Sequence, residues 1–157
     1  MSLRDILDAA LSEREDEPSY FQLLRSHHFE AAVPVIRQAM TQNDGQAMGF
    51  YASLLVTGQG VAKDLEQAVD WFREGAILGD VFCQTALGVC LSAGIGLDVD
   101  PREASFWLYV AACAGQPLAI NLLSDVVGLD PGLVGIHFTI EQYLDLMTEL
   151  RRPRVVH

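Results

Sequence analysis

A 36-residue repeat constrains this sequence more than any other feature. The segment from Gly58 to Gly79 recurs from Gly94 to Gly115, with seven identical positions. The identical pairs are Gly58/Gly94, Gly60/Gly96, Asp64/Asp100, Ala68/Ala104, Trp71/Trp107, Ala76/Ala112 and Gly79/Gly115. A fixed period of this length is typical of repeat proteins, in which each unit buries its apolar faces against its neighbours.

Each copy predicts two antiparallel helices joined by a glycine-rich turn. In the first copy we expect one helix over residues 46–57, and another that begins after Asp64 and ends at Gly79. In the second copy we expect a helix over 81–93 and another that begins after Asp100. Asp100 at the cap position, Pro101 at the first helical position and Glu103 at the third each indicate that this helix begins here. The glycines of the turn end each first helix, because glycine adopts positive φ without a steric cost.

Small residues at helical spacing predict where the helices cross. Two antiparallel helices approach closely only where one of them presents Ala or Gly. The candidates are Ala68, Gly75 and Ala76 in the first copy and Ala104, Ala111 and Ala112 in the second. In the first copy the buried stripe also includes Leu65 and Phe72. Trp71 and Trp107 are expected to pack between one helix pair and the next, not to stack on a ligand.

The segment before the repeats predicts less regular helices. An amphipathic helix is expected over residues 2–15, and a degenerate helix pair over 19–42. Pro34 either kinks the second helix of that pair or begins it as its first residue. The turn-forming residues 43–45 then end this helix.

The segment after Gly115 predicts an incomplete further repeat. A helix is expected over residues 117–127, but the second helix of the pair is missing from the pattern. A helix over 139–150 is expected to cover the last exposed face, with residues 151–157 as a loose tail.

This pattern resembles the Sel1-like repeat family, which is related to the tetratricopeptide repeat. The second copy matches the family motif at Leu87, Gly88, Gly94, Gly96, Asp100, Ala104, Trp107, Ala111, Ala112 and Gly115, and the first at Ala47, Gly58, Gly60, Val61, Asp64, Ala68, Trp71, Ala76 and Gly79. The sequence departs from the motif where Tyr51-Ala52 replaces Leu-Gly, and where Leu55 and Leu91 replace Tyr. The resemblance covers residues 45–127. It implies an α-solenoid that mediates protein–protein contacts and has no general catalytic residues.

We therefore expect an all-α fold, a right-handed α-α superhelix (solenoid) of about four helical hairpins whose outer members are degenerate. The chain is expected to be one domain over 1–157. It divides into irregular N-terminal helices over 1–44, repeats over 45–127, and a C-terminal cap and tail over 128–157.

The expected partner-binding surface is the concave face, which the first helices of the pairs line in such solenoids. Side chains on these helices outside the Ala/Leu stripe are the candidates for contact with a partner. They are Met48, Ser53, Thr85, Val89, Asn121 and Asp125.

The net charge of −11 limits the classes of partner. An acidic surface disfavours nucleic acid and anionic membranes, and it attracts a basic protein. No apolar run approaches the length of a transmembrane helix. The N-terminus lacks the pattern of a secretory signal, and three cysteines without one suggest reduced thiols in the cytoplasm. The sequence leaves the oligomeric state open.

No constellation of residues indicates catalysis, a metal site or a cofactor. The four histidines are His27, His28, His137 and His157, and none has metal-ligand spacing. The Gly-x-Gly turns follow a helix instead of a strand, which disfavours a phosphate-binding loop. Some secreted relatives carry a disulfide in each hairpin. Here Cys83 and Cys90 lie about 10 Å apart on one helix, too far for a bond, whereas Cys113 could approach Cys83.

Three functions remain open at this point. The first is a cytoplasmic adaptor or scaffold that binds another protein. The second is an immunity protein that neutralises a basic toxin, because an acidic surface would speed their association. The third is a hydrolase, since some members of the family are linked to β-lactams. The sequence has no Ser-x2-Lys motif, which argues against the hydrolase.

Overall fold

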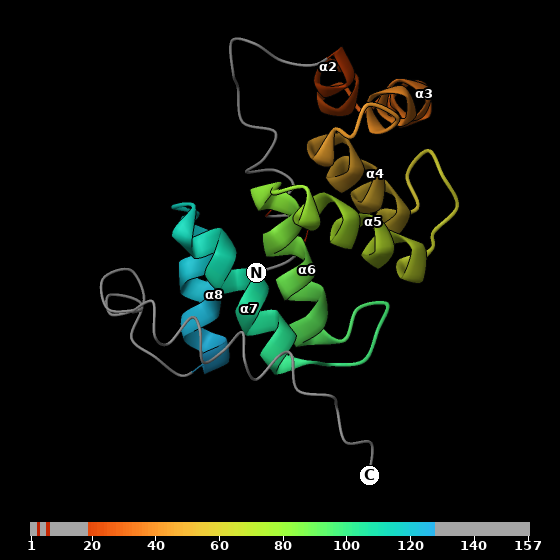
Figure 1. The fold of residues 1–157 in the computed structure, drawn as a ribbon. Helices are drawn as coiled ribbons and strands as arrows, with labels where there is room; N and C mark the ends of the chain where they lie inside the picture. Colours follow the sequence, from red (N-terminus) through yellow and green to blue (C-terminus); the bar gives the residue numbers. More distant parts are fainter. Residues whose placement is uncertain (1–2, 4–5, 7–18, 128–157) are drawn as a thin grey trace.

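The computed structural model describes Leu3, Ile6 and residues 19–127 (Figure 1). Within residues 19–127 the chain forms helices and no strand. The helices are α2 (Ser19–Arg25), α3 (Phe29–Met40), α4 (Gly45–Thr57), α5 (Leu65–Ile77), α6 (Val81–Ala93), α7 (Pro101–Cys113) and α8 (Pro117–Val127). The predicted helices over 46–57, 81–93 and 117–127 thus agree with α4, α6 and α8 within one residue at each end.

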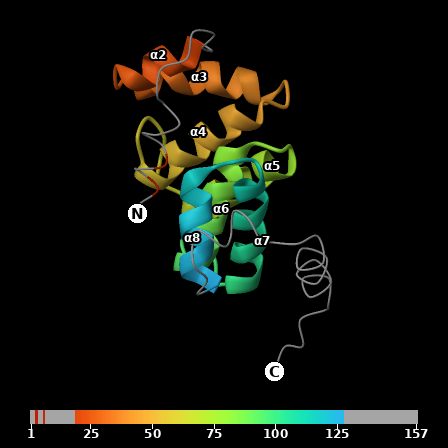
Figure 2. The ribbon, with the colours of Figure 1, turned by 90° about the vertical axis from the view of Figure 1, so that its left-hand side faces the viewer.

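The helices stack in chain order, from α2 and α3 at one end to α7 and α8 at the other (Figures 1 and 2). Each helix packs against the next, and the most extensive contacts are those of α4 with α5 and of α6 with α7. The first helices of successive pairs also contact each other, α4 with α6 and α6 with α8. This arrangement confirms the prediction of an all-α solenoid of stacked hairpins.

Four aspartates begin the helices of the two repeats. Each carboxylate accepts hydrogen bonds from backbone N–H groups of the first turn, which have no partner inside the helix. The acceptor–donor pairs are Asp44 with Gln46 and Ala47 (3.0 and 3.1 Å), Asp64 with Gln67 (3.0 Å), Asp80 with Cys83 (2.8 Å), and Asp100 with Arg102 and Glu103 (both 3.1 Å). The predicted caps Asp64 and Asp100 are confirmed, and Asp44 and Asp80 play the same role for α4 and α6.

Glycines end the first helix of each pair, as predicted. Gly58 after α4 has φ 70° and Gly94 after α6 has φ 71°, both in the left-handed region. The backbone N–H of each glycine donates to the carbonyl oxygen four residues earlier, Leu54 and Cys90. A side chain would be strained at both positions.

The second glycine of each turn rests against the backbone of the preceding repeat. A Cβ atom placed on Gly60 would lie 2.8 Å from the carbonyl carbon of Phe29, and one on Gly96 would lie 2.4 Å from the carbonyl oxygen of Leu65. Phe29 and Leu65 are the first residues of α3 and α5. The turn of one pair therefore contacts the start of the second helix of the pair before it, in the same way at both places.

Helix α3 lies in register with α5 and α7, because each begins 36 residues after the previous one. The sequence shows the relation in four identities between α3 and α5, which are Glu30/Glu66, Ala32/Ala68, Val33/Val69 and Arg37/Arg73. Helix α3 is thus the second helix of an earlier, incomplete pair. It begins at Phe29 and continues through Pro34, so the alternative in which the helix begins at Pro34 is wrong. Pro34 and Glu30 are both exposed, so water can solvate the Glu30 carbonyl that loses its helical N–H partner.

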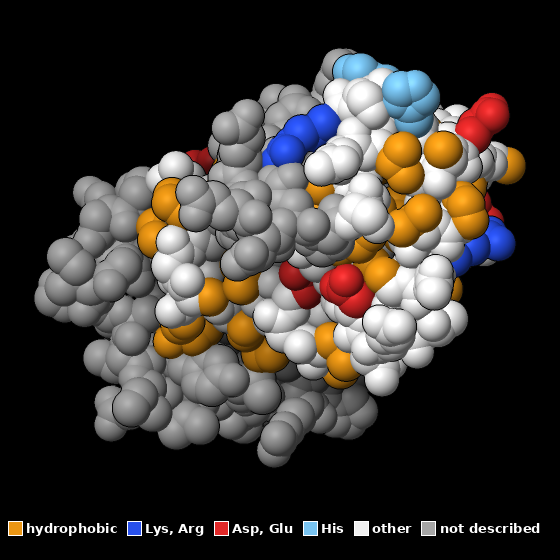
Figure 3. All heavy atoms as spheres, turned by 90° about the horizontal axis from the view of Figure 1, so that it is seen from above, with side chains coloured by type: hydrophobic (Ala, Val, Ile, Leu, Met, Phe, Trp, Pro, Cys, Tyr) orange, Lys and Arg blue, Asp and Glu red, His pale blue; other side chains and the backbone are white. Residues whose placement is uncertain are grey.

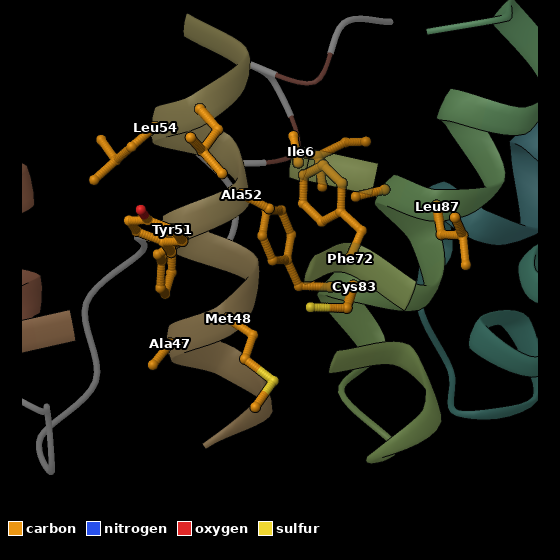
Figure 4. Close-up of a cluster of buried hydrophobic side chains, with 14 of the residues drawn as sticks. Ile6, Ala47, Met48, Tyr51, Ala52, Leu54, Phe72, Cys83 and Leu87 are labelled. Carbon is orange, nitrogen blue, oxygen red and sulfur yellow. The ribbon is translucent and has the colours of Figure 1, made fainter. Parts of the chain in front are cut away.

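Small side chains stand at the helix crossings, as predicted for Ala68, Gly75 and Ala104, whereas the predicted Ala112 is only half-buried. Ala32, Ala68 and Ala104 occupy the same register position in α3, α5 and α7, and all three are fully buried. At Gly75 of α5 the neighbouring helix is so close that a Cβ atom would lie 2.4 Å from Sγ of Cys83. Figure 4 shows the resulting core, with Phe72 of α5 between Ile6 and the side chains of α6.

Helix α2 is held to the repeats by Tyr20. Its hydroxyl donates a hydrogen bond to the Asp44 carboxylate that caps α4 (3.1 Å), and its ring packs against Phe50 with centroids 6.0 Å apart. Burial first, and then the charge of Asp44, raise the pKa of Tyr20 far above its ordinary value. The hydroxyl therefore keeps its proton and remains a donor.

Several predicted segments lie outside the described residues. They are the helix over 2–15, apart from Leu3 and Ile6, which are helical, the helix over 139–150, and the tail over 151–157. The division into 1–44, 45–127 and 128–157 within one domain stays a prediction.

Candidate partner-binding groove

A hollow of about 540 Å³ lies where α3, α4 and α5 meet. Side chains from all three helices line it, namely Arg37, Met40, Thr41, Tyr51, Gln67, Asp70 and Trp71. The second helices α3 and α5 form its walls, and Tyr51 of α4 is buried between them. We call this place the first groove.

Arg37 lies over the Tyr51 ring in the first groove, and this ring in turn contacts Trp71. Nη2 of Arg37 donates a hydrogen bond to the Tyr51 hydroxyl (2.6 Å), and its Cζ lies 5.2 Å from the centroid of the Tyr51 ring. The Trp71 ring meets Tyr51 edge to face, with centroids 6.1 Å apart and an interplanar angle of 81°. A guanidinium over an aromatic face is attracted by the ring quadrupole, and it still has N–H donors to offer. The groove therefore presents a positioned cation beside a half-buried indole.

The equivalent place one repeat later contains an ion pair. Positions 36 residues on from Arg37, Gln67 and Trp71 are occupied by Arg73, Glu103 and Trp107. Arg73 forms a salt bridge with Glu103. The indole Nε1 of Trp107 donates to the same carboxylate oxygen, Oε1, at 3.3 Å. The Glu103 carboxylate thus accepts from both Arg73 and Trp107. We call this group of three residues the second joint.

The first groove has the same two donors without that carboxylate. Gln67 is neutral and stands where Glu103 stands in the second joint. Within residues 19–127, Arg37 forms no salt bridge, and the indole N–H of Trp71 makes no hydrogen bond. Asp70 also lines the groove, and it too forms no ion pair within this range.

The six side chains predicted to bind a partner divide into two groups. Met48, Ser53, Thr85 and Val89 are 0–7% exposed, because α4 and α6 are covered on nearly every side by neighbouring helices. The hydroxyl groups of Ser53 and Thr85 donate to carbonyl oxygens of their own helices. Asn121 and Asp125 on α8 are exposed. Partner binding by these six stays a prediction, and only the two on α8 are accessible.

Sequence reasoning misses the first groove and its residues Arg37, Tyr51 and Trp71 as a unit. The repeat pattern indicates only packing for Trp71, and it does not single out Arg37. They could have been found from the register of α3 with α5, which aligns Arg37 with Arg73. The same 36-residue offset aligns Gln67 with Glu103 and shows that the carboxylate is missing from the first groove.

The histidines within residues 19–127 lie on the surface. His27 and His28 are exposed, and Nδ1 of His28 lies 2.8 Å from Oγ of Ser26. In the view from above in Figure 3, the pale-blue histidine side chains lie at one edge of the molecule, away from the acidic side chains in the middle of the view. In the described part of the chain, no three His, Cys, Asp or Glu side chains gather as a metal site would require.

The cysteines differ in exposure. Cys83 and Cys90 are fully buried, whereas Cys113 is exposed at the end of α7, and all three are free. Sγ of Cys83 donates to the carbonyl oxygen of Gly45 (3.3 Å). Burial, and for Cys83 also the charge of Asp80, raises both thiol pKa values, that of Cys90 to about 12. A nucleophilic thiolate is therefore disfavoured at these two positions.

Alkylation is expected to separate Cys113 from the two buried thiols. With iodoacetamide at about pH 8, the folded protein should react at Cys113 at least about 100-fold faster than at Cys83 or Cys90, because Cys113 is exposed whereas the other two thiols are buried and their pKa values are raised. Peptide mapping by mass spectrometry measures the three rates. All three should become equally reactive in denaturant. Comparable labelling of Cys83 and Cys113 in the folded protein would contradict the buried position of Cys83.

Antiparallel helix pairs that repeat every 36 residues and stack in chain order define an α-solenoid repeat protein. The family model of the Sel1 repeat matches residues 45–80 and 81–116, so each match is one helix pair, α4 with α5 and α6 with α7. The chain therefore carries two Sel1 repeats, and the predicted resemblance is confirmed. Sel1 repeats are generally protein–protein interaction modules. Helix α8 extends the same register beyond the matched residues.

Two solved structures share this fold. A Sel1 repeat protein from Oxalobacter formigenes aligns with TM-score 0.66 and 23% identity, over 83% of this chain and 52% of the other. A protein described as a protective antigen present in uropathogenic Escherichia coli strains, with an SLR fold, aligns with TM-score 0.62 and 21% identity, over 96% of this chain and 34% of the other. The chain spans about half of the first structure and a third of the second.

A search among curated proteins found no match. Among the described helices, none has the length and apolar character needed to cross a membrane.

Proposed function

We propose that this chain is a non-catalytic protein–protein interaction module that binds a protein partner at the first groove. The observation that carries the proposal is the pairing of Sel1 repeats with an open groove of about 540 Å³. A half-buried tryptophan such as Trp71 and an accessible arginine such as Arg37 are the residue types that dominate protein interfaces. The chemistry of the groove thus suits a partner better than it suits catalysis.

The finer role that we propose is a cytoplasmic adaptor or scaffold. Three free thiols support a reducing compartment. The net charge of −11 supports a partner with a basic surface, because long-range attraction speeds encounter, and it argues against nucleic acid and anionic membranes. A second candidate, an immunity protein for a basic toxin, rests on the same charge. Co-expression with a candidate toxin tests it, since an absence of protection contradicts it.

A bulky residue at Thr41 tests the proposed site. Thr41 is exposed and lines the first groove, so Thr41→Trp should fill the groove without removing a core contact. The partner that co-purifies with the wild-type chain should bind at least about tenfold more weakly, as when a central interface contact is blocked. Mass spectrometry identifies the partner, and titration calorimetry measures its affinity.

The matched control is Gln42→Trp, which changes an exposed neighbour that does not line the groove. This variant should bind like the wild type. Equal affinity of Thr41→Trp and the wild type would locate the interface elsewhere. Failure to recover any reproducible partner would contradict the proposed function as a whole.

A further inference from the structure

The second joint shows what the first groove lacks. At the second joint, Glu103 pairs with Arg73 and accepts the indole N–H of Trp107. A carboxylate therefore fits between an arginine of one second helix and a tryptophan of the next. The same two donors, Arg37 and Trp71, face the first groove with Gln67 in place of the glutamate.

The space for an external carboxylate is present in the first groove. The hollow is open to the surface and its volume of about 540 Å³ exceeds that of a single amino-acid side chain. Arg37 uses one donor on the Tyr51 hydroxyl, and the cation lies over the Tyr51 ring, so its position is set before any ligand arrives. A guanidinium pre-organised in this way favours a planar carboxylate, to which it can donate two parallel hydrogen bonds.

We propose that the first groove binds an Asp or Glu side chain of the partner protein, which takes the place that Glu103 takes in the second joint. The partner carboxylate accepts from the guanidinium of Arg37 and from the indole N–H of Trp71. This inference rests on the proposed function and names the chemistry of its site. It is compatible with a partner that is basic overall, because net charge governs encounter over long distances and the groove selects one side chain at contact.

Among the described residues, Asp70 is the one other charged side chain that lines the first groove. Its carboxylate repels the anion that Arg37 attracts, and it lies on α5 immediately before Trp71. Asp70 thereby limits the affinity for an isolated carboxylate. Replacing Asp70 by Asn should raise that affinity about two- to fivefold, the range expected for removal of one partly solvated like charge.

The two tryptophans of the chain provide a direct test. Proton–nitrogen NMR should give one indole N–H signal for each of them, and the signal of Trp107, already bonded to Glu103, serves as an internal reference. The probe is a capped tripeptide, acetyl-Ala-Glu-Ala-amide, and the matched control is the same peptide with Gln. The Glu peptide should shift the Trp71 signal in a saturable manner that weakens with salt, while the Gln peptide should leave it unchanged.

Gln67→Glu is the decisive variant, because it supplies the missing carboxylate from within the chain. The new carboxylate should pair with Arg37 as Glu103 pairs with Arg73, and a glutamate at this first-turn position suits the helix that Asp64 caps. The variant should remain folded and should bind the Glu peptide at least about tenfold more weakly, the effect of losing a hydrogen bond to a charged group. Gln67→Met keeps the position neutral and should retain binding.

Three outcomes overturn the inference. They are no shift of the Trp71 signal, an equal shift with the Gln peptide, and undiminished binding by Gln67→Glu. Each would leave the co-purification experiment on Thr41→Trp unaffected. A partner lost in Thr41→Trp but retained in Gln67→Glu would support the proposed function and overturn the carboxylate inference.

Discussion

Replacing Gly96 with alanine is expected to lower the free energy of unfolding by about 3–4 kcal/mol, the range of severe backbone and packing changes. Two effects add at this position. Gly96 has φ 73°, where a side chain costs about 1–2 kcal/mol, and its new Cβ would lie 2.4 Å from the carbonyl oxygen of Leu65. That oxygen belongs to the backbone of α5, so the clash is relieved only when the turn moves away from the helix.

The matched control is Gly115→Ala. Gly115 also has positive φ, 82°, but no atom lies within 4 Å of its would-be Cβ. Only the conformational cost remains, so the loss should be about 1–2 kcal/mol. Urea denaturation followed by circular dichroism gives both values. Equal losses in the two variants would mean that the contact between Gly96 and α5 contributes nothing to stability.

Truncation of Phe72 to alanine is expected to cost about 3–5 kcal/mol of unfolding free energy, as for other buried aromatic side chains. Phe72 is fully buried in α5, and its ring meets Phe82 of α6 edge to face, with centroids 6.1 Å apart. Figure 4 shows Phe72 in the middle of the core between neighbouring helices. The substitution therefore leaves a cavity at the contact between the two repeats.

Ile77→Ala on the same helix provides the comparison. Ile77 is 65% exposed, so its truncation should change the free energy of unfolding by less than about 0.5 kcal/mol. Both variants can be measured in the same denaturation series. A loss below about 1 kcal/mol for Phe72→Ala would contradict the tight packing of α5 against α6.

The sequence predicts the helix boundaries well, because they depend on local interactions. Asp64, Asp100, Gly58 and Gly94 act within one turn of the backbone, so their residue types alone indicate where helices begin and end. The period of 36 then predicts that the pairs stack, because identical faces must be buried in identical ways. Fold class and most helix bounds follow from these two kinds of signal.

The surface of the solenoid is harder to predict, because it depends on contacts among several helices. Thr85 and Val89 lie outside the Ala/Leu stripe of α6, yet both are buried, since α6 contacts α4, α5, α7 and α8. The candidate groove requires a comparison between α3 and α5, and the sequence pattern of α3 indicates only a degenerate pair. The missing carboxylate of the first groove depends on one position, Gln67 against Glu103, and these two residue types differ little in helix propensity.

The contact of Gly60 with Phe29, and of Gly96 with Leu65, joins a later turn to an earlier helix in both cases. During translation, the helix backbone against which each turn packs is therefore synthesised before the turn itself. Each new hairpin can dock as soon as it emerges, without waiting for downstream sequence. We therefore expect the solenoid to assemble in the direction of translation.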